Sequence, residues 1–223
     1  MDNKGASSRA KQIKYLTYNT MKKRTIKEIT DRKILNSLER WLESATPEQR
    51  YNGLRWYNEA QDWAKYLAET FGIDRYKSAA VISALSPNNK WARNKVDAFN
   101  VCQAWKDGKT ANDVKVCTYG ANKRKAFEIL DGNTEITAKS PKTHAFAANV
   151  GLLAADFVTV DKWHIRACLC SPKDGVKDTV ESCTPAQYRR LEALTLKLAR
   201  KYGLKGYEVQ AVIWVSIKDN WGR

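Results

Sequence analysis

An amine and a carboxylate stand at the two ends of one predicted helix, within residues 136–166 (ITAKSPKTHAFAANVGLLAADFVTVDKWHIR). Lys142 precedes an Ala-rich stretch with helical periodicity, and Asp161 follows that stretch in the sequence Val-Thr-Val-Asp. A carboxylate stabilises the positive charge that develops on a sugar when its N-glycosidic bond breaks, and it can take a proton from the attacking group. A lysine amine that desolvation keeps neutral can itself attack as the nucleophile. The pair therefore suggests cleavage of N-glycosidic bonds in nucleic acid.

The residues around this pair also have structural interpretations. Asp161 can cap the helix that follows it, and Lys142 can be a solvated residue of a first helical turn. Both interpretations of these two residues stay open at this point. For Asn149 we expect a hydrogen bond to the backbone of the preceding hairpin, and for Trp163 and His164 we expect packing or support.

A second candidate site is the polar segment SPNNKWARN at residues 86–94, which separates two predicted helices. Amide and cationic side chains of this kind can contact bases and phosphates. The residues that we expect to contact nucleic acid here are Asn88, Asn89, Lys90, Arg93 and Asn94. The alternative is a capped turn between helices, with Asn88 as the N-cap and Trp91 in the core.

The net charge of +15 and the pI near 9.6 favour a nucleic-acid partner, here DNA. Solubility alone, or attraction to a membrane surface, would be the alternative reasons for such a charge. Many cations precede residue 34, which predicts a flexible basic arm over residues 1–25 and one domain over residues 26–223. No apolar run approaches the roughly 18 residues of a membrane span, and no secretory signal opens the chain. We expect a cytoplasmic monomer without membrane contact.

The five cysteines are odd in number and irregularly spaced, at positions 102, 117, 168, 170 and 183. Cys168 and Cys170 are two residues apart, but no second pair or histidine cluster completes a zinc pattern. The sequence therefore predicts free thiols in a reducing compartment, with no metal site and no cofactor.

Apolar periodicity predicts an all-α fold without strands or repeats. Thr46-Pro47 and Thr184-Pro185 each resemble an N-cap followed by proline at the first helical position. The apolar stretch SAAVISAL suits a buried central helix. The predicted helices span residues 26–44, 47–71, 77–85, 90–105, 122–130, 142–153, 162–169, 185–201 and 206–218.

The motifs of this chain resemble those of the helix-hairpin-helix (HhH-GPD) DNA glycosylase superfamily, which includes endonuclease III. Its signature joins a hairpin, a Lys-Thr helix start, an asparagine inside that helix and Val-Asp-x-His. The matching residues are Lys142-Thr143, Asn149, Val160-Asp161 and His164, with Ser83–Ser86, Trp91 and Asn94 similar to the first core helix and its loop. The resemblance covers residues 75–170. It implies a two-lobed helical domain with a shared cleft, into which DNA presents a flipped base.

Three departures accompany the resemblance. The family hairpin usually carries two glycines that let backbone N–H groups approach a phosphate, and Ala138 and Ser140 stand there instead. The hairpin is therefore degenerate, and Lys139 and Ser140 would contact phosphate through their side chains. His164 is one residue late, and the four cysteines of the iron–sulfur cluster are absent.

These observations lead to one leading hypothesis and two alternatives. The first is a DNA glycosylase of modification or repair, with Asp161 as the catalytic carboxylate and Lys142 as a possible Schiff-base nucleophile and AP lyase residue. The second is a phage DNA base-hypermodification enzyme, pyrophosphorylase-like, that installs amines on modified thymine in the host cytoplasm. The third is a non-catalytic DNA-binding protein on the same scaffold.

Overall fold

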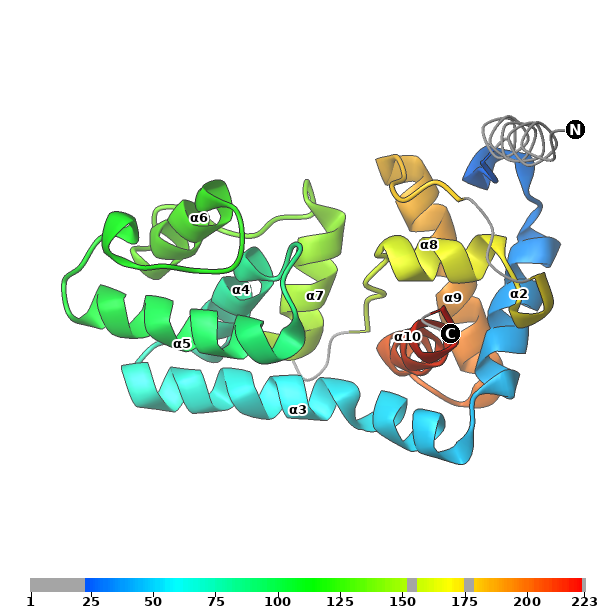
Figure 1. Ribbon diagram of the computed structural model, residues 1–223, viewed down its shortest axis with the longest axis horizontal. Coiled ribbons are helices and arrows are strands. Elements are labelled where there is room, and N and C mark those ends of the chain that lie inside the picture. Colours follow the sequence, from blue (N-terminus) through cyan, green and yellow to red (C-terminus); the bar gives the residue numbers. More distant parts are fainter. Residues whose placement is uncertain (1–22, 152–155, 175–178, 222–223) are drawn as a thin grey trace, which may run out of the picture.

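The computed structural model describes residues 23–151, 156–174 and 179–221, and over these ranges the fold is all-α (Figure 1). The described part of the chain has no strand, only an isolated bridge between Arg24 and Thr179. The helices are α2 (Asp31–Ser44), α3 (Pro47–Phe71), α4 (Arg75–Leu85), α5 (Trp91–Lys106), α6 (Gly120–Leu130), α7 (Pro141–Gly151), α8 (Lys162–Leu169), α9 (Pro185–Tyr202) and α10 (Gly206–Trp221). Short 3₁₀ turns are η1 (Ile26–Glu28), η2 (Ala111–Asp113) and η3 (Pro172–Asp174).

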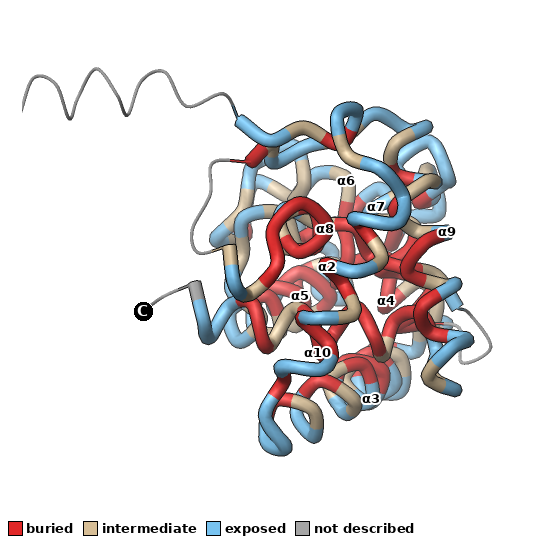
Figure 2. Tube along the Cα trace, turned by 90° about the vertical axis from the view of Figure 1, so that its right-hand side faces the viewer, coloured by how far each residue is buried: buried red, intermediate tan, exposed pale blue. Residues whose placement is uncertain are grey.

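The buried side chains form two separate hydrophobic clusters, which define two lobes. The central lobe consists of α3 to α7, and its core is rich in alanine and aromatic residues. The terminal lobe consists of α2 with α8, α9 and α10, so it joins the first described helix to the last ones. The lobes lie side by side, with the central one at the left of Figure 1. Buried positions run through the interior of both, and α8 is buried along most of its length (Figure 2).

Helices α3 and α10 join the lobes, because each contributes to both cores. On α3, Tyr57 belongs to the central core while Leu54 packs against the terminal one. On α10, Ala211 belongs to the central core and Val212 to the terminal one. The two helices cross closely at Gly53, where a Cβ atom would collide with the backbone of Val212. Glycine at this position therefore permits the crossing.

Several predicted helix boundaries are confirmed, because local capping signals decide them. Thr46 forms a capping box with Gln49 at the start of α3, with Pro47 in the first turn. Thr184 does the same with Gln187 at the start of α9. The apolar α4 is buried continuously from residue 78 to residue 85, as expected for a central helix.

The predicted start of the first helix, residues 26–44, is wrong. The α-helix starts at Asp31, because the Thr30 side chain accepts a hydrogen bond from the Lys33 N–H at 3.4 Å and Ile29 is extended. Ile26 is buried in the terminal core from a 3₁₀ turn instead. Ile26 is apolar because it is buried, and its spacing from the apolar residues of α2 matches helical periodicity although residues 26–30 are not α-helical.

The predicted basic arm, residues 1–25, falls mostly outside the described residues, which begin at residue 23. At its end Arg24 is held in place, since its guanidinium donates to the Leu169 carbonyl at 2.9 Å and to Asp174 at 3.1 Å. The Val180 N–H also donates to the Arg24 carbonyl. The folded unit therefore begins before residue 26. The predicted helix 142–153 corresponds to α7, and its last two residues lie outside the described ranges.

The cysteines are all free thiols, and Cys102, Cys168 and Cys170 are buried. Over residues 23–151, 156–174 and 179–221, no group of three or more His, Cys, Asp or Glu side chains is arranged to hold a metal ion. None of the helices in these ranges has the length and apolar character needed to cross a membrane.

Candidate active site in the interlobe cleft

A cleft of about 1090 Å³ is lined by residues of both lobes. Helix α7 of the central lobe faces the start of α8 in the terminal lobe (Figure 1). The central lobe supplies residues 86–90, Asn122, Lys125 and residues 140–143. The terminal lobe supplies residues 160–163, residues 181–183, Tyr188, Trp214 and Lys218. The cleft is large enough to hold a nucleoside.

Asp161 lies on the terminal wall of this cleft and caps α8 at the same time. Its Oδ1 accepts the His164 N–H at 2.8 Å, so the carboxylate sits at the positive end of the helix. Burial raises the pKa of Asp161, and this effect outweighs the opposing backbone N–H groups, the Lys142 charge and the Trp214 indole. A carboxylate with a raised pKa is a stronger proton acceptor than an ordinary one. Capping and catalysis are therefore compatible at this residue.

Lys142 lies across the cleft from Asp161, in the first turn of α7. Its side chain is exposed, and its positive charge acts on Asp161 through space. The fold thus brings the predicted amine and carboxylate to one cleft. They come from different lobes, although only one helix and a loop separate them in sequence.

The backbone before Asp161 is held by Asn149, which is buried on α7. The Asn149 amide donates to the Phe157 carbonyl at 2.8 Å and accepts the Phe157 N–H at 3.0 Å. The Asn149 carbonyl in turn accepts the Gln61 amide at 2.8 Å. The predicted partner, the hairpin backbone, is therefore wrong, because the side chain of Asn149 pairs with the backbone of Phe157 instead. Asn149 supports the segment that leads to Asp161.

Tyr188 on α9 fixes the same segment from the other side. Its hydroxyl lies 2.6 Å from the Val158 carbonyl and accepts the Val160 N–H at 3.2 Å. It also lies 3.3 Å from the carbonyl of Pro141, the residue before Lys142. Burial raises the pKa of this phenol, so it stays protonated at neutral pH. The sequence carries no signal for this role, because Tyr188 occupies an ordinary apolar position of an amphipathic helix.

Trp163 and His164 support the site differently. The His164 ring is buried, with Nε2 2.8 Å from the Thr195 hydroxyl, and burial lowers its pKa to about 4. The ring is therefore neutral at pH 7 and lies among the core residues behind Asp161. Trp163 lines the cleft, and the Arg166 guanidinium lies 4.8 Å from its ring centroid.

Trp214 and Lys218 of α10 complete the terminal wall. The Lys218 ammonium lies 4.1 Å from the Trp214 ring centroid, in a cation–π contact. The nearby Trp214 indole acts on Asp161 by lowering the pKa of its carboxyl, against the larger effect of burial. The position of Trp214 on the cleft wall depends on how α10 packs against α3 and α8.

The turn between α4 and α5 divides into cleft residues and packing residues. Asn88, Asn89 and Lys90 line the cleft. Arg93 instead pairs with the buried Asp97 at 2.9 Å. Asn94 is 2% exposed and donates to the Ile82 carbonyl at 3.1 Å, which holds α5 against α4.

The interpretation of Asn88 as an N-cap is wrong, because Lys90 occupies the N-cap position of α5. Asn88 has a left-handed backbone with φ 57°, and its amide donates to the Tyr119 hydroxyl at 2.6 Å. The Asn89 amide donates to Asp97 at 2.9 Å. Side-chain hydrogen bonds therefore hold this turn at the cleft.

The degenerate hairpin forms a turn that needs no glycine. The Ser140 N–H donates to the Thr137 carbonyl at 2.9 Å, and Lys139 and Ser140 are both exposed. Among the non-glycine residues that the structure describes, Asn88 is the one with a positive φ, so Ala138 and Ser140 have ordinary backbone angles. Ser140 lines the cleft, whereas Lys139 is not among its lining residues.

The cleft is strongly basic. Its lining residues include five lysines, namely Lys90, Lys125, Lys142, Lys162 and Lys218. The two carboxylates are Asp161 and Glu181, and Glu181 is paired with Arg166. The walls therefore favour an anionic ligand.

Comparison with known families agrees with the extent of this fold. A family model described as "Family of unknown function (DUF7178)" matches residues 20–221. The chain belongs to the DUF7178 family. The match includes both lobes and all residues that line the cleft. Neither a curated protein nor a solved structure matches the chain.

Proposed function

We propose that this protein is a DNA glycosylase-like enzyme that cleaves the N-glycosidic bond of a base placed in the interlobe cleft. The observation that carries the proposal is the partly buried carboxylate of Asp161, with its raised pKa, in a basic cleft opposite Lys142. The resemblance of residues 75–170 to the helix-hairpin-helix glycosylases supports the same assignment of roles. So do the two lobes and their shared cleft, which that resemblance implies.

The chemistry needs one carboxylate close to the sugar. As the bond from C1′ to the base nitrogen breaks, positive charge develops on the sugar, and the Asp161 carboxylate stabilises it. A water attacks C1′, its proton passes to Asp161, and the base leaves with the electron pair of the broken bond. If Lys142 attacks instead, a C1′–nitrogen bond forms and rearranges to a Schiff base, which permits strand cleavage.

Incubation with duplexes that carry assorted damaged or modified bases tests this function. We expect an abasic product from at least one duplex, and its loss in Asp161→Asn, which retains a capping side chain. Borohydride then traps a covalent complex only if Lys142 attacks, and Lys142→Met would abolish the trapping. Identical product yields for wild type and Asp161→Asn, or none from any duplex, would contradict the proposal.

A second function, base hypermodification, is favoured by the five lysines of the cleft. Release of a base requires no such number of cations, whereas displacement of pyrophosphate by an amine does require a site for that anion. Asp161 would then take the proton from the attacking amine. Release of inorganic pyrophosphate from DNA with a pyrophosphorylated modified thymine, together with a new amine-bearing nucleoside in mass spectra, would favour this function.

A non-catalytic DNA-binding protein is the third candidate. It predicts steeply salt-dependent, sequence-independent binding and no product with either substrate. Binding and turnover measured on one preparation separate it from the two enzymes.

A further inference from the structure

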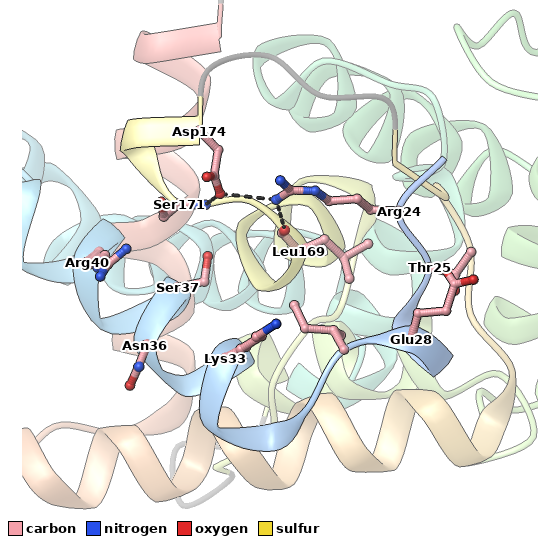
Figure 3. A pocket seen from close by; sticks show the side chains of 11 residues that line it. Arg24, Thr25, Glu28, Lys33, Asn36, Ser37, Arg40, Leu169, Ser171 and Asp174 are labelled. Carbon is pink, nitrogen blue, oxygen red and sulfur yellow. Dashed lines mark hydrogen bonds and ion pairs between the residues drawn. The ribbon is translucent and has the colours of Figure 1, made fainter. Parts of the chain in front are cut away.

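A second hollow, of about 480 Å³, lies in the terminal lobe between η1, α2, the end of α8 and η3 (Figure 3). Nine of its eleven lining residues are polar or charged, and the two apolar ones are Ile29 and Leu169. Small-molecule sites are lined mostly by apolar side chains. The composition of this hollow is closer to that of surfaces that follow a charged polymer backbone.

The charges of the hollow do not balance within it. Its lining residues include three cations and two carboxylates, which leaves one excess positive charge. Arg24 pairs with Asp174 at 3.1 Å, and the Glu28 carboxylate accepts the Thr25 hydroxyl at 2.9 Å. Lys33 and Arg40 are exposed, and no hydrogen bond or ion pair of their side chains is formed with a described residue. These two cations are therefore available to a ligand from outside.

Lys33 and Arg40 lie on one face of α2, seven residues and thus about 10 Å apart along the helix axis. Ser37 between them donates to the Ala167 carbonyl at 2.8 Å and fixes α2 against α8. One strand of a duplex advances about 3.4 Å per phosphate along the duplex axis, so two cations aligned with that axis span roughly three nucleotides. Two cations at such a separation match a row of phosphates better than one small anion.

The hollow and the cleft are connected by α8. The helix begins beside Asp161, which lines the cleft, and ends at Leu169, which lines the hollow. Its eight residues cover about 12 Å. We propose that this hollow binds the phosphodiester backbone three to four nucleotides from the nucleotide in the cleft, through Lys33 and Arg40. The inference rests on the proposed action on DNA.

The test compares two double variants that each remove two exposed cations from the terminal lobe. Lys33→Gln/Arg40→Gln removes those of the hollow. Lys197→Gln/Arg200→Gln removes two from α9 that line neither the hollow nor the cleft. Binding to a fluorescent duplex is measured by anisotropy across a salt series, with folding checked by circular dichroism.

We expect the hollow variant to bind at least about tenfold more weakly at 0.1 M salt, with a salt slope lower by about 1.8. The control variant should bind like wild type. Shortening the duplex on one side of the target nucleotide should remove the difference between wild type and the hollow variant. Equal losses in both variants, or no loss in the hollow variant, would overturn the inference.

Two further measurements separate this inference from other outcomes. If a nucleoside monophosphate binds wild type but not the hollow variant in calorimetry, the hollow takes a free phosphate and the polymer assignment fails. If the hollow variant binds weakly while no substrate yields an Asp161-dependent product, the proposed function fails and the inference stands. If the hollow variant binds like wild type while a substrate yields an Asp161-dependent product, the inference is rejected and the proposed function stands.

Discussion

Two backbone segments face each other across the cleft, and they are held in very different ways. The turn at residues 137–140 is exposed and closed by its own backbone hydrogen bond. The segment at residues 156–161 is held by side chains from other elements, including Asn149 and Tyr188. Side chains from other elements therefore hold the backbone before the carboxylate, whereas hydrogen bonds between sequence neighbours hold the hairpin turn. Preorganisation of this kind matters most for a group that acts on a developing charge.

The largest expected effect concerns the carboxylate of Asp161, at the end of the segment at residues 156–161. Asp161→Asn should lower the rate of base release by about 10²–10³, the cost typical of removing one preorganised electrostatic group. Lys139→Gln, in the turn at residues 137–140, removes one exposed charge outside the cleft lining. It should change the rate less than about threefold, a rough bound for one exposed charge. Single-turnover rates of both variants check the comparison, and equal losses would show that the two sides contribute alike.

Removal of the Asn149 amide should destabilise the protein most. Asn149→Ala leaves the partly buried N–H and carbonyl of Phe157 without these partners, which costs about 1–3 kcal/mol. Chemical denaturation measures the loss. Asn100→Ala, at an exposed position of α5, is the matched control and should lie within about 0.5 kcal/mol of wild type. A mild effect of Asn149→Ala would mean that the segment before Asp161 is held mainly by other contacts.

A smaller effect is expected for Tyr188→Phe, which removes one hydroxyl and keeps the ring. The free energy of unfolding should fall by about 1–2 kcal/mol, because the Val160 N–H and Val158 carbonyl lose a partner. Since Asp161 follows this segment, kcat should fall while KM stays near the wild-type value. An unchanged kcat with reduced stability would limit Tyr188 to a role in folding.

The pKa of Asp161 predicts opposite pH dependences for activity and stability. Its folded pKa is raised above the unfolded value, so its contribution to stability is fully present below the unfolded pKa and is lost as pH rises through the folded pKa. Asp161→Asn has no such dependence and should become more stable relative to wild type as pH rises. Activity, which needs the carboxylate, should fall on the acidic side at a pH above the usual range of aspartate. Denaturation and rates measured across pH check both trends.

The smallest effect is expected for the turn at residues 137–140. Replacing Ala138 and Ser140 together by glycine restores the hairpin glycines, but neither residue has a positive φ. We expect a loss of stability below about 1 kcal/mol from backbone entropy and no gain in DNA affinity. Anisotropy with a duplex measures the affinity. A clear gain would show that this turn can still bind phosphate through its backbone.

The sequence predicted features that depend on neighbours along the chain. The caps at Thr46 and Thr184, the buried α4 and the start of α8 after Asp161 all follow from residues within one turn. These local signals predicted the all-α fold and most helix boundaries. They failed at residues 26–30, where burial imitates helical periodicity.

Residues whose roles depend on packing could not be predicted. Tyr188 contacts the segment before Asp161 from 28 and 30 positions away in sequence. The effect of Trp214 on the pKa of Asp161 depends on how α10 packs against α3 and α8. Asn149 was expected to be structural, but its partner follows from the path of residues 156–157, which no local pattern specifies.

The crossing of α3 and α10 at Gly53 bears on how a substrate would enter the cleft. Because both helices contribute to both cores, bending either one at this point would disturb the packing of both lobes. In the proposed reaction on DNA, the target nucleotide would have to rotate out of the duplex into the cleft, at a cost of a few kcal/mol. Base pairs that open readily would enter most often. Selection among damaged or modified bases would thus begin with the stability of the base pair, before any side chain of the cleft contacts the base.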